Sequence, residues 1–269
     1  MSPLVPDFVR ACGGVRVRFA AVGDHTKAVE RFESGGYRVR LPRTAGECEA
    51  VLINTGGGMA GGDRMTVSLS VEQQGSAVVT TQAAEKLYRA QDAATEIEID
   101  LRLDRGSRLD WLPQETILFS GSRWRRRLSV QMAADASLTL AESLVFGRVA
   151  MNEMMGLGFC HDRWRVRRDG RLIFAEDLHL DGDFAALLAA PASGHSARAL
   201  ATILHVSPDA ESRVEEARGL LETCASECGA SAWNGMLVIR LLSNDPQALR
   251  NDLVGVLEKF RHGPMPRSW

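Results

Sequence analysis

The sequence is poor in aromatic residues, in cysteine and in long apolar runs. Only 6% of its 269 residues are aromatic, and its five cysteines are scattered along the chain. An odd, scattered set of cysteines argues against a disulfide framework and favours a reducing compartment, so we expect a cytoplasmic protein. No apolar run approaches the ~18 residues of a membrane span, and residues 1–7 lack the features of a signal peptide. We therefore expect no membrane partner.

Neither sign of charge is in large excess. The formal net charge is −2, which gives no general footprint for nucleic acid or for an anionic membrane. Hydrophobic residues make up 45% of the chain and charged residues 25%, as in a soluble globular protein with a substantial core. The length allows one large domain or two ordinary ones.

A glycine-rich segment, Asn54–Arg64, is the most distinctive stretch of the chain. It joins an apolar run at 50–53 to an alternating run at 65–71, so we predict a loop between two strands. A dinucleotide loop would need a helix after the glycines, and a P-loop would need lysine where Asp63 stands. A glycine turn in a β protein is therefore the favoured interpretation.

Turn signals recur at a nearly constant spacing through the middle of the chain. Their markers are Gly75, Gly106, Ala136 and Gly170, at intervals of 31, 30 and 34 residues. Such a period predicts stacked supersecondary units, and hence a mainly β body of stacked or superhelical strand layers. Six residues after each marker, and so in one column if the units stack in register, stand Thr81, Leu112, Glu142 and Glu176.

The pattern changes after residue 182. We expect a short helix at 184–190, a strand at 201–206, a helix from Asp209 to about Glu227, a strand at 236–242 and a helix from Pro246 to Gly263. The predicted organisation is a β-rich body at 1–182 and a small α+β portion at 183–269, packed as one compact unit. The segment 266–269, which ends in Trp269, is interpreted as an exposed docking element.

Three chemical hypotheses arise from the residues alone. Cys224 and Cys228 are the only close cysteine pair, but core thiols explain them better than a permanent metal site. Glu142 and Glu176 could be the acid/base pair of a hydrolase, which in a retaining glycosidase lie about 5 Å apart. The run Arg123–Arg127 could bind nucleic acid, although a strand face that meets solvent or an acidic protein is favoured.

Six blocks, taken in order, resemble the urease accessory protein D family. The blocks are Gly57–Asp63, Thr80-Thr81 with Lys86-x-Tyr88-Arg89, Trp111–Ile117, Gly147-Arg148 with Glu153, Arg168–Gly170 with Glu176, and Pro266-Arg267 with Trp269. Within them, the positions assigned to structural motifs are Gly57, Gly58, Gly61, Gly62, Trp111, Pro113, Gln114, Glu115, Arg148 and Glu153. The chain departs from the family pattern at Thr55-Gly56 and at Gln82–Ala84, where the family usually has proline.

This resemblance implies a mostly β, non-enzymatic scaffold without a permanently bound cofactor. Proteins of this kind bind a helical accessory protein, F, and through it a nickel-carrying GTPase, G, which holds the GTP. They dock on the urease apoprotein in a heteromeric complex that is dimerised through F. A water-filled passage is thought to guide Ni²⁺ to the nascent active site.

An ion in transit needs few and weak oxygen ligands, because a Cys/His cage would retain nickel. We therefore predict that Asp63, Glu142 and Glu176 line an interior path for Ni²⁺, with Thr80 and Thr81 nearby. The alternative for Asp63 is an ion pair with Arg64 or Arg148 that holds the glycine loop shut.

Overall fold

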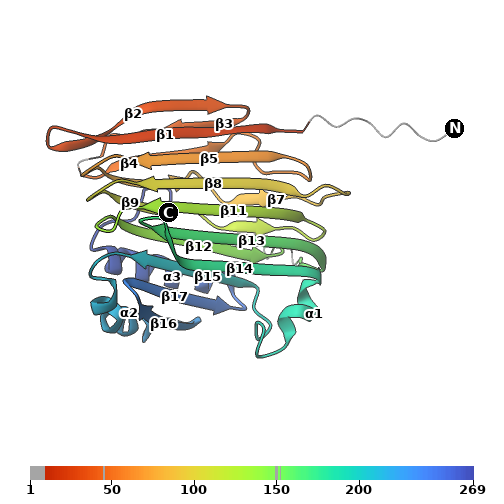
Figure 1. Ribbon diagram of the computed structural model, residues 1–269. Helices are drawn as coiled ribbons and strands as arrows, with labels where there is room; N and C mark the ends of the chain where they lie inside the picture. Colours follow the sequence, from red (N-terminus) through yellow and green to blue (C-terminus); the bar gives the residue numbers. More distant parts are fainter. Residues whose placement is uncertain (1–9, 45, 149–150, 152) are drawn as a thin grey trace.

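The chain folds as a sandwich of two β-sheets (Figure 1). The computed structural model describes residues 10–44, 46–148, 151 and 153–269. The first sheet, in spatial order, contains β2 (His25–Ser34), β1 (Cys12–Val22), β5 (Arg64–Val71), β8 (Thr95–Leu103), β11 (Arg123–Met132), β13 (Leu157–Arg168) and β14 (Arg171–Asp183). The second contains β3 (Tyr37–Arg40), β4 (Cys48–Asn54), β6 (Ser76–Thr81), β9 (Arg108–Leu112), β12 (Ser137–Phe146), β15 (Ala199–Val206), β17 (Met236–Ser243) and β16 (Glu227–Trp233). The short strand β10 (Thr116–Leu118) also pairs with β12, and β7 (Glu85–Leu87) pairs with β10.

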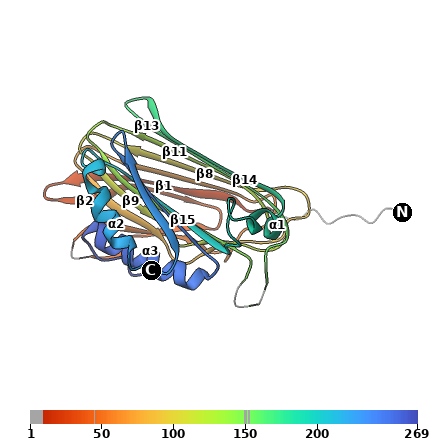
Figure 2. The ribbon, with the colours of Figure 1, turned by 90° about the horizontal axis from the view of Figure 1, so that it is seen from below.

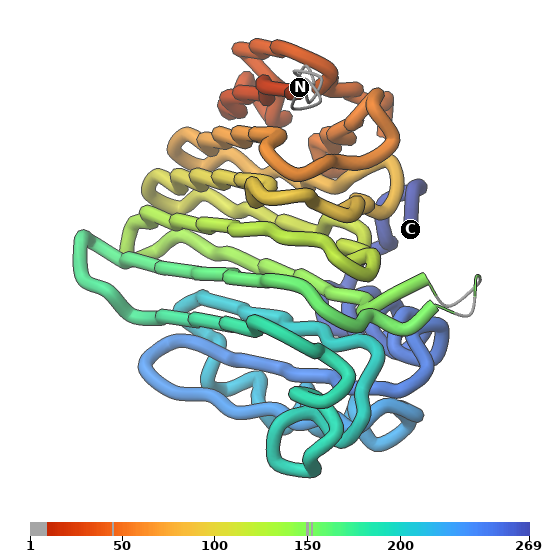
Figure 3. The backbone as a smooth tube through the Cα atoms, turned by 90° about the vertical axis from the view of Figure 1, so that its right-hand side faces the viewer, coloured from red at the N-terminus to blue at the C-terminus, as the bar shows by residue number. Residues whose placement is uncertain are grey.

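From β4 to β13 the chain alternates between the two sheets, so that successive turns stack in parallel (Figure 3). The turns bond to one another as they stack. The amide of Arg108 donates to the carbonyl of Gly75 at 2.8 Å, and the amide of Ser137 donates to that of Ser107 at 2.9 Å. The prediction of a mainly β body built from stacked strand layers is confirmed.

The fourth turn marker behaves differently from the other three. The turns at Gly75, Gly106 and Ala136 carry the chain from the first sheet to the second, whereas the turn at Gly170 joins β13 to β14 as an antiparallel hairpin within the first sheet. The predicted column is therefore wrong at its last member, because Glu176 lies on the other sheet from Glu142.

Two apolar cores hold the layers together. The larger lies between the sheets and includes Val17, Val67, Val130 and Leu140. The smaller lies between the outer face of the second sheet and the helices α2 (Val214–Leu221) and α3 (Pro246–Arg261). Figure 2 shows both helices on the opposite side of the molecule from β8, β11 and β13.

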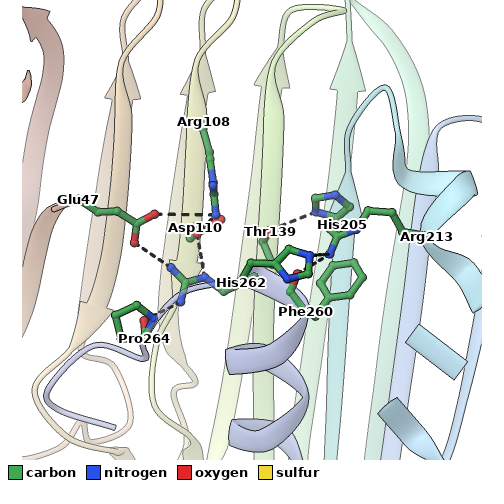
Figure 4. A network of polar contacts seen from close by, with 10 residues as sticks. Glu47, Arg108, Asp110, Thr139, His205, Arg213, Phe260, His262 and Pro264 are labelled. Atoms are coloured by element: carbon green, nitrogen blue, oxygen red, sulfur yellow. Dashed lines mark hydrogen bonds and ion pairs between the residues drawn. The ribbon is translucent and has the colours of Figure 1, made fainter. Parts of the chain in front are cut away.

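Buried ion pairs fix the end of α3 to the second sheet (Figure 4). The Arg261 guanidinium donates to the Asp110 carboxylate at 2.8 Å and to Glu47 at 3.2 Å. Arg108 donates to the same oxygen of Asp110 at 2.9 Å. The side chains of Arg261 and Asp110 are both almost fully buried, so their ion pair fixes the position of the end of α3 on the sheet.

The carboxyl-terminal third differs from expectation in three places. The helix expected to continue to Glu227 ends at Leu221, and residues 227–233 form β16 instead. The Asp209 side chain makes no cap, because it accepts from the Ser207 hydroxyl. The tail is folded against the body, since the Trp269 indole donates to the Leu112 carbonyl at 2.9 Å.

The other expected elements of this region are present. A short helix, α1 (Phe184–Ala189), is capped by Asp183, and α3 begins at Pro246. None of the helices in the described part of the chain is both long and apolar enough to span a bilayer.

Candidate functional site

A cavity of about 140 Å³ lies between the two sheets, beneath the glycine loop. Apolar side chains of the sandwich core form much of its wall, among them Val15, Leu52 and Ile99. Polar and charged side chains also line it, among them Asn54, Thr81, Glu85, Thr116, Arg126 and Glu142, together with Arg38, Lys86 and Gln114. Polar groups inside a largely apolar sandwich need partners, and the way in which each is satisfied determines what the cavity can do.

Glu142 enters the cavity wall from β12 and is 3% exposed. One of its oxygens accepts from the Trp111 indole at 2.8 Å, and the other forms an ion pair with Arg126 of the opposite sheet. Arg126 also donates twice to Asp162, at 2.8 and 2.5 Å. The cluster therefore connects the two sheets through one cation and two carboxylates.

The charges of this cluster do not cancel. Burial raises the pKa of Glu142, and the neighbouring carboxylate of Asp162 adds to the effect, while Arg126 and the indole of Trp111 oppose it. The two acids raise the pKa of Arg126, so the guanidinium stays charged. Glu142, which was predicted to line an interior path for Ni²⁺, thus belongs to a tightly bonded cluster at the cavity wall.

Glu85 is the other carboxylate of the cavity, and sequence reasoning missed it. It lies on the three-residue strand β7 and accepts from the Asn54 amide at 3.0 and 3.2 Å. Burial raises its pKa to about 7, and the hydrogen bond from Asn54 opposes the increase. A signal was available, because Glu85 stands between the Thr80-Thr81 and Lys86-x-Tyr88-Arg89 parts of one family block.

Asp63 holds the glycine loop through backbone amides. It is 7% exposed and accepts from the amides of Ala11 at 2.8 Å and Ala60 at 2.7 Å. Within the described residues it makes no ion pair with Arg64 or Arg148, so the alternative prediction of such an ion pair is wrong. Because both of its oxygens accept amide protons, Asp63 fastens the loop to the chain that precedes β1.

The glycine loop is packed against the strand β7. The Tyr88 hydroxyl donates to the Gly57 carbonyl at 3.0 Å, and the amide of Met59 donates to the Lys86 carbonyl at 2.7 Å. A Cβ on Gly58 would lie 2.6 Å from the Tyr88 ring, which explains why glycine is needed there. The prediction of a loop between two strands is confirmed, and the two strands belong to different sheets.

The two threonines point to opposite faces of β6. Thr81 lines the cavity and accepts from the amide of Gln114 at 2.9 Å. Thr80 is fully buried on the other face, where it accepts from the Trp269 indole at 3.1 Å. Adjacent strand residues face opposite sides, so only Thr81 can meet anything inside the sandwich.

The remaining family-motif residues support the structure around the cavity. Trp111 is 2% exposed at the cavity wall, and β9 ends one residue before Pro113, as expected for a strand corner. Glu115 pairs with Arg250 of α3 at 2.6 Å. Arg148 pairs with Glu153 at 2.5 Å.

Glu176 lies on β14, where it pairs with Arg240 of β17. It is not among the residues that line the cavity, so the structure does not bring it together with Glu142 and Asp63. Both glutamates of the hydrolase hypothesis are paired with arginine, and they sit on different sheets. This arrangement does not resemble an acid/base pair that faces a common cleft.

The basic run of β11 does not form one patch. Arg123, Arg125 and Arg127 face outward, whereas Trp124 and Arg126 are buried between the sheets. Strand alternation thus leaves three of the four arginines of this run on the outer surface, and Arg126 cannot take part in a nucleic-acid site there. In the described part of the chain, no three His, Cys, Asp or Glu side chains are placed to hold a metal ion.

Comparison with known proteins identifies the family of this chain. The family model described as UreD urease accessory protein matches residues 11–269. The chain belongs to the UreD family. It is 49% identical to the urease accessory protein UreD of Methylobacterium sp. (strain 4-46) over 275 residues, which cover 100% of this chain and 98% of that protein. It is 47% identical to the UreD of Xanthobacter autotrophicus over 260 residues, 97% of this chain and 90% of that protein.

Proposed function

We propose that this chain is a non-enzymatic scaffold that binds the urease apoprotein and the accessory proteins F and G, and guides Ni²⁺ through its interior. Nickel is cargo in transit, and no cofactor is bound permanently, since the GTP belongs to protein G. The complex is heteromeric and assembles in the cytoplasm. The family relationship supports the urease role, and the polar cavity between the sheets supports an internal route.

The observation that carries the proposal is the half-buried Glu85, a carboxylate that lines the cavity between the sheets and has no arginine partner among the described residues. Its described contacts are the amide of Asn54 and the backbone of Lys86, with no cation bonded to its oxygens. Carboxylate, hydroxyl and amide oxygens bind a divalent cation weakly enough for it to leave. Glu85 and Thr81 are therefore the oxygen donors that a passing Ni²⁺ meets in the cavity.

The other predicted carboxylates act on the route indirectly. Glu142 and Arg126 form its wall, Asp63 fixes the glycine loop above it, and Glu176 joins the two sheets through Arg240. These three carboxylates already have strong partners, which makes them poor ligands for an ion that must exchange rapidly.

The test is the double variant Thr81→Val/Glu85→Gln, which keeps the volume of both side chains and removes the hydroxyl group and the carboxylate charge. Urease matured in cells with this variant is expected to contain less nickel and to lose most of its activity. Pull-down of apourease with F and G is expected to be unchanged, because both residues are inside the sandwich.

The matched control is Glu258→Gln, the same change at an exposed position of α3, away from the cavity. This control is expected to support normal nickel content. Normal nickel content with the folded double variant would refute the internal route. If the wild-type chain bound neither apourease nor F, the scaffold role would be refuted instead.

A further inference from the structure

None of the helices in the described ranges covers the outer face of the first sheet. The helices α2 and α3 contact β15, β16 and β17 on the other side of the sandwich, and α1 contacts β14 at one end (Figure 2). The strands β1, β5, β8, β11 and β13 are parallel, and parallel sheets are nearly always covered on both faces. A parallel sheet with one uncovered face is unusual enough to suggest a partner.

Arginine dominates this face. Strand alternation turns outward the arginines 16, 18, 64, 102, 123, 125, 127, 163, 165 and 167, which are exposed or half-buried. The acids on the same face are Glu30, Glu72, Glu96, Glu98, Asp100, Asp177 and Asp181. Because the whole chain has a net charge of −2, the excess of arginine here is local, and the rest of the surface is more acidic.

The charges are arranged in stripes along the strands. In one row, Glu98 of β8, Arg127 of β11, Arg163 of β13 and Asp177 of β14 are direct neighbours. Arginine therefore occupies the two middle strands and acid the two flanking strands. The stripes are about 4.8 Å apart, the spacing of neighbouring strands.

The ion pairs within the stripes leave hydrogen-bond donors free. Arg125 pairs with Glu96 at 3.2 Å and Arg163 with Asp177 at 3.3 Å. A guanidinium has five N–H donors, so each arginine keeps several for another molecule. The Arg127 side chain is 66% exposed even though it is paired with Glu98. Exposed pairs of this kind add little to stability, so folding does not account for the stripes.

One part of the face is preorganised. The guanidinium carbons of Arg123 and Arg125 lie 5.1 and 4.9 Å from the centre of the Phe159 ring. Stacking on an aromatic ring limits the motion of an arginine side chain and lowers the entropy lost on binding. Arginine, unlike lysine, is enriched at protein interfaces and binds carboxylates through two parallel bonds.

We propose that the outer face of the first sheet docks an acidic protein surface whose carboxylates align with the arginine stripes of β11 and β13. The acid stripes of β8 and β14 favour a protein over a nucleic acid, because a continuous phosphate backbone would be repelled by them. The inference rests on the proposed function, since it assigns this face to a partner in the urease maturation complex.

The experiment compares two double variants with the same change in net charge. Arg125→Glu/Arg127→Glu changes the striped face, and Arg105→Glu/Arg218→Glu changes exposed arginines elsewhere. Purified urease apoprotein and purified accessory protein F are the two protein probes, titrated separately at two salt concentrations. Thermal unfolding of both variants checks that they fold as the wild type does.

We expect the striped-face variant to weaken binding of one probe at least tenfold, and the control to change it less than twofold. High salt is expected to reduce the difference, because exposed charges are screened. Equal binding by the two variants, with a wild type that binds, overturns the docking face alone. A wild type that binds neither probe overturns the proposed function together with the docking face.

A duplex DNA probe distinguishes the remaining class of partner. We expect no DNA binding by the wild type at ~0.15 M salt, where non-specific affinity is already weak. DNA binding that is lost in Arg125→Glu/Arg127→Glu and kept in the control would assign the face to nucleic acid and overturn the proposal.

Discussion

Arg126 and Glu142 form an ion pair across the interior of the sandwich, one residue from each sheet. Both side chains are less than 5% exposed. Arg126 completes its bonding with Asp162, and Glu142 completes its own with Trp111. A charge network buried this deeply is strongly destabilised when one partner is removed, because the others stay charged and unpaired.

The first prediction concerns this network. Arg126→Met leaves the carboxylates of Glu142 and Asp162 buried without a cation, and we expect it to lower the free energy of unfolding by about 3–5 kcal/mol. Urea denaturation measures the change. Arg127→Met, the neighbouring residue on the outer face, is expected to lower it by less than about 1 kcal/mol.

A neutral version of the cluster tests the cause. Adding Glu142→Gln and Asp162→Asn to Arg126→Met removes the two unpaired charges, so we expect at least half of the lost stability to return. If the triple variant were as unstable as Arg126→Met, lost packing and not unpaired charge would be responsible.

The second prediction concerns pH and Glu85. Burial raises its pKa from the ordinary 4.5 to about 7 in the folded protein, so the folded state binds the proton more tightly. Its contribution to stability is full below pH 4.5 and is lost as the pH rises to about 7. Between pH 4.5 and 8, the free energy of unfolding of the wild type is expected to fall by up to about 3 kcal/mol on account of this group. Glu85→Gln is expected not to show this decrease.

Urea denaturation of the wild type and of Glu85→Gln from pH 4.5 to 8 tests this slope. The difference between the two proteins should grow with pH and level off above pH 7. Glu98→Gln serves as the control, since this carboxylate lies on the outer face of β8. A difference that is constant over the whole range would contradict the assigned protonation.

The third prediction has the opposite sign. Burial lowers the pKa of His205 to about 4, and its Nδ1 lies 3.1 Å from the Thr139 hydroxyl. The folded state therefore holds the neutral imidazole, and its contribution to stability is lost as the pH falls from 6.5 to 4. The loss should reach up to about 3 kcal/mol, and His205→Asn should not show it.

Thermal unfolding at pH 7.5, 6 and 4.5 follows this effect. The wild type should lose stability relative to His205→Asn at each step down. His262, which is 70% exposed, provides the control, because His262→Asn should have no such effect. An imidazole signal of His205 that titrated near pH 6.5 by NMR would show the prediction to be wrong.

The fourth prediction uses two glycines with opposite surroundings. A Cβ on Gly14 would lie 1.9 Å from the Thr66 carbonyl oxygen, where β1 and β5 approach each other. Gly14→Ala should therefore destabilise the protein by about 1–3 kcal/mol or more. A Cβ on Gly255, within α3, meets nothing within 4 Å. Gly255→Ala should stabilise it by about 0.5–1 kcal/mol.

Denaturation midpoints of these two variants at one pH decide the matter. The signs are expected to differ, although the chemical change is the same. Destabilisation by both would mean that α3 cannot accept a methyl group where the structure leaves room for one.

The stacked architecture could be predicted from sequence because the turn signals repeat once per coil, where a coil is one passage of the chain through a strand of each sheet. The markers Gly75, Gly106 and Ala136 each follow a strand of the first sheet, so their spacing records the length of one coil. The fourth marker, Gly170, has the same turn chemistry but forms a hairpin. A turn signal shows where the chain reverses and does not show which sheet it enters next.

The candidate site was predictable only in part. Glu142 is buried, and its partner Arg126 lies in a run of arginines whose other members face solvent. Alternation with Leu128 and Val130 places Arg126 on the inward face, but nothing local in the sequence pairs it with Glu142. Glu85 was missed because β7 is too short for alternation to show which side it faces. The end of α2 was misplaced because apolar residues continue at helical spacing past Leu221.

The hairpin of β13 and β14 has a consequence for how proteins of this shape can change in length. Each coil hydrogen-bonds to the next through equivalent backbone groups, so a whole coil could be gained or lost between β5 and β11 while its neighbours kept their contacts. The antiparallel strand β14 breaks that equivalence and sets the end of the array. Growth or shrinkage of the molecule is thereby confined to whole coils inserted before the hairpin.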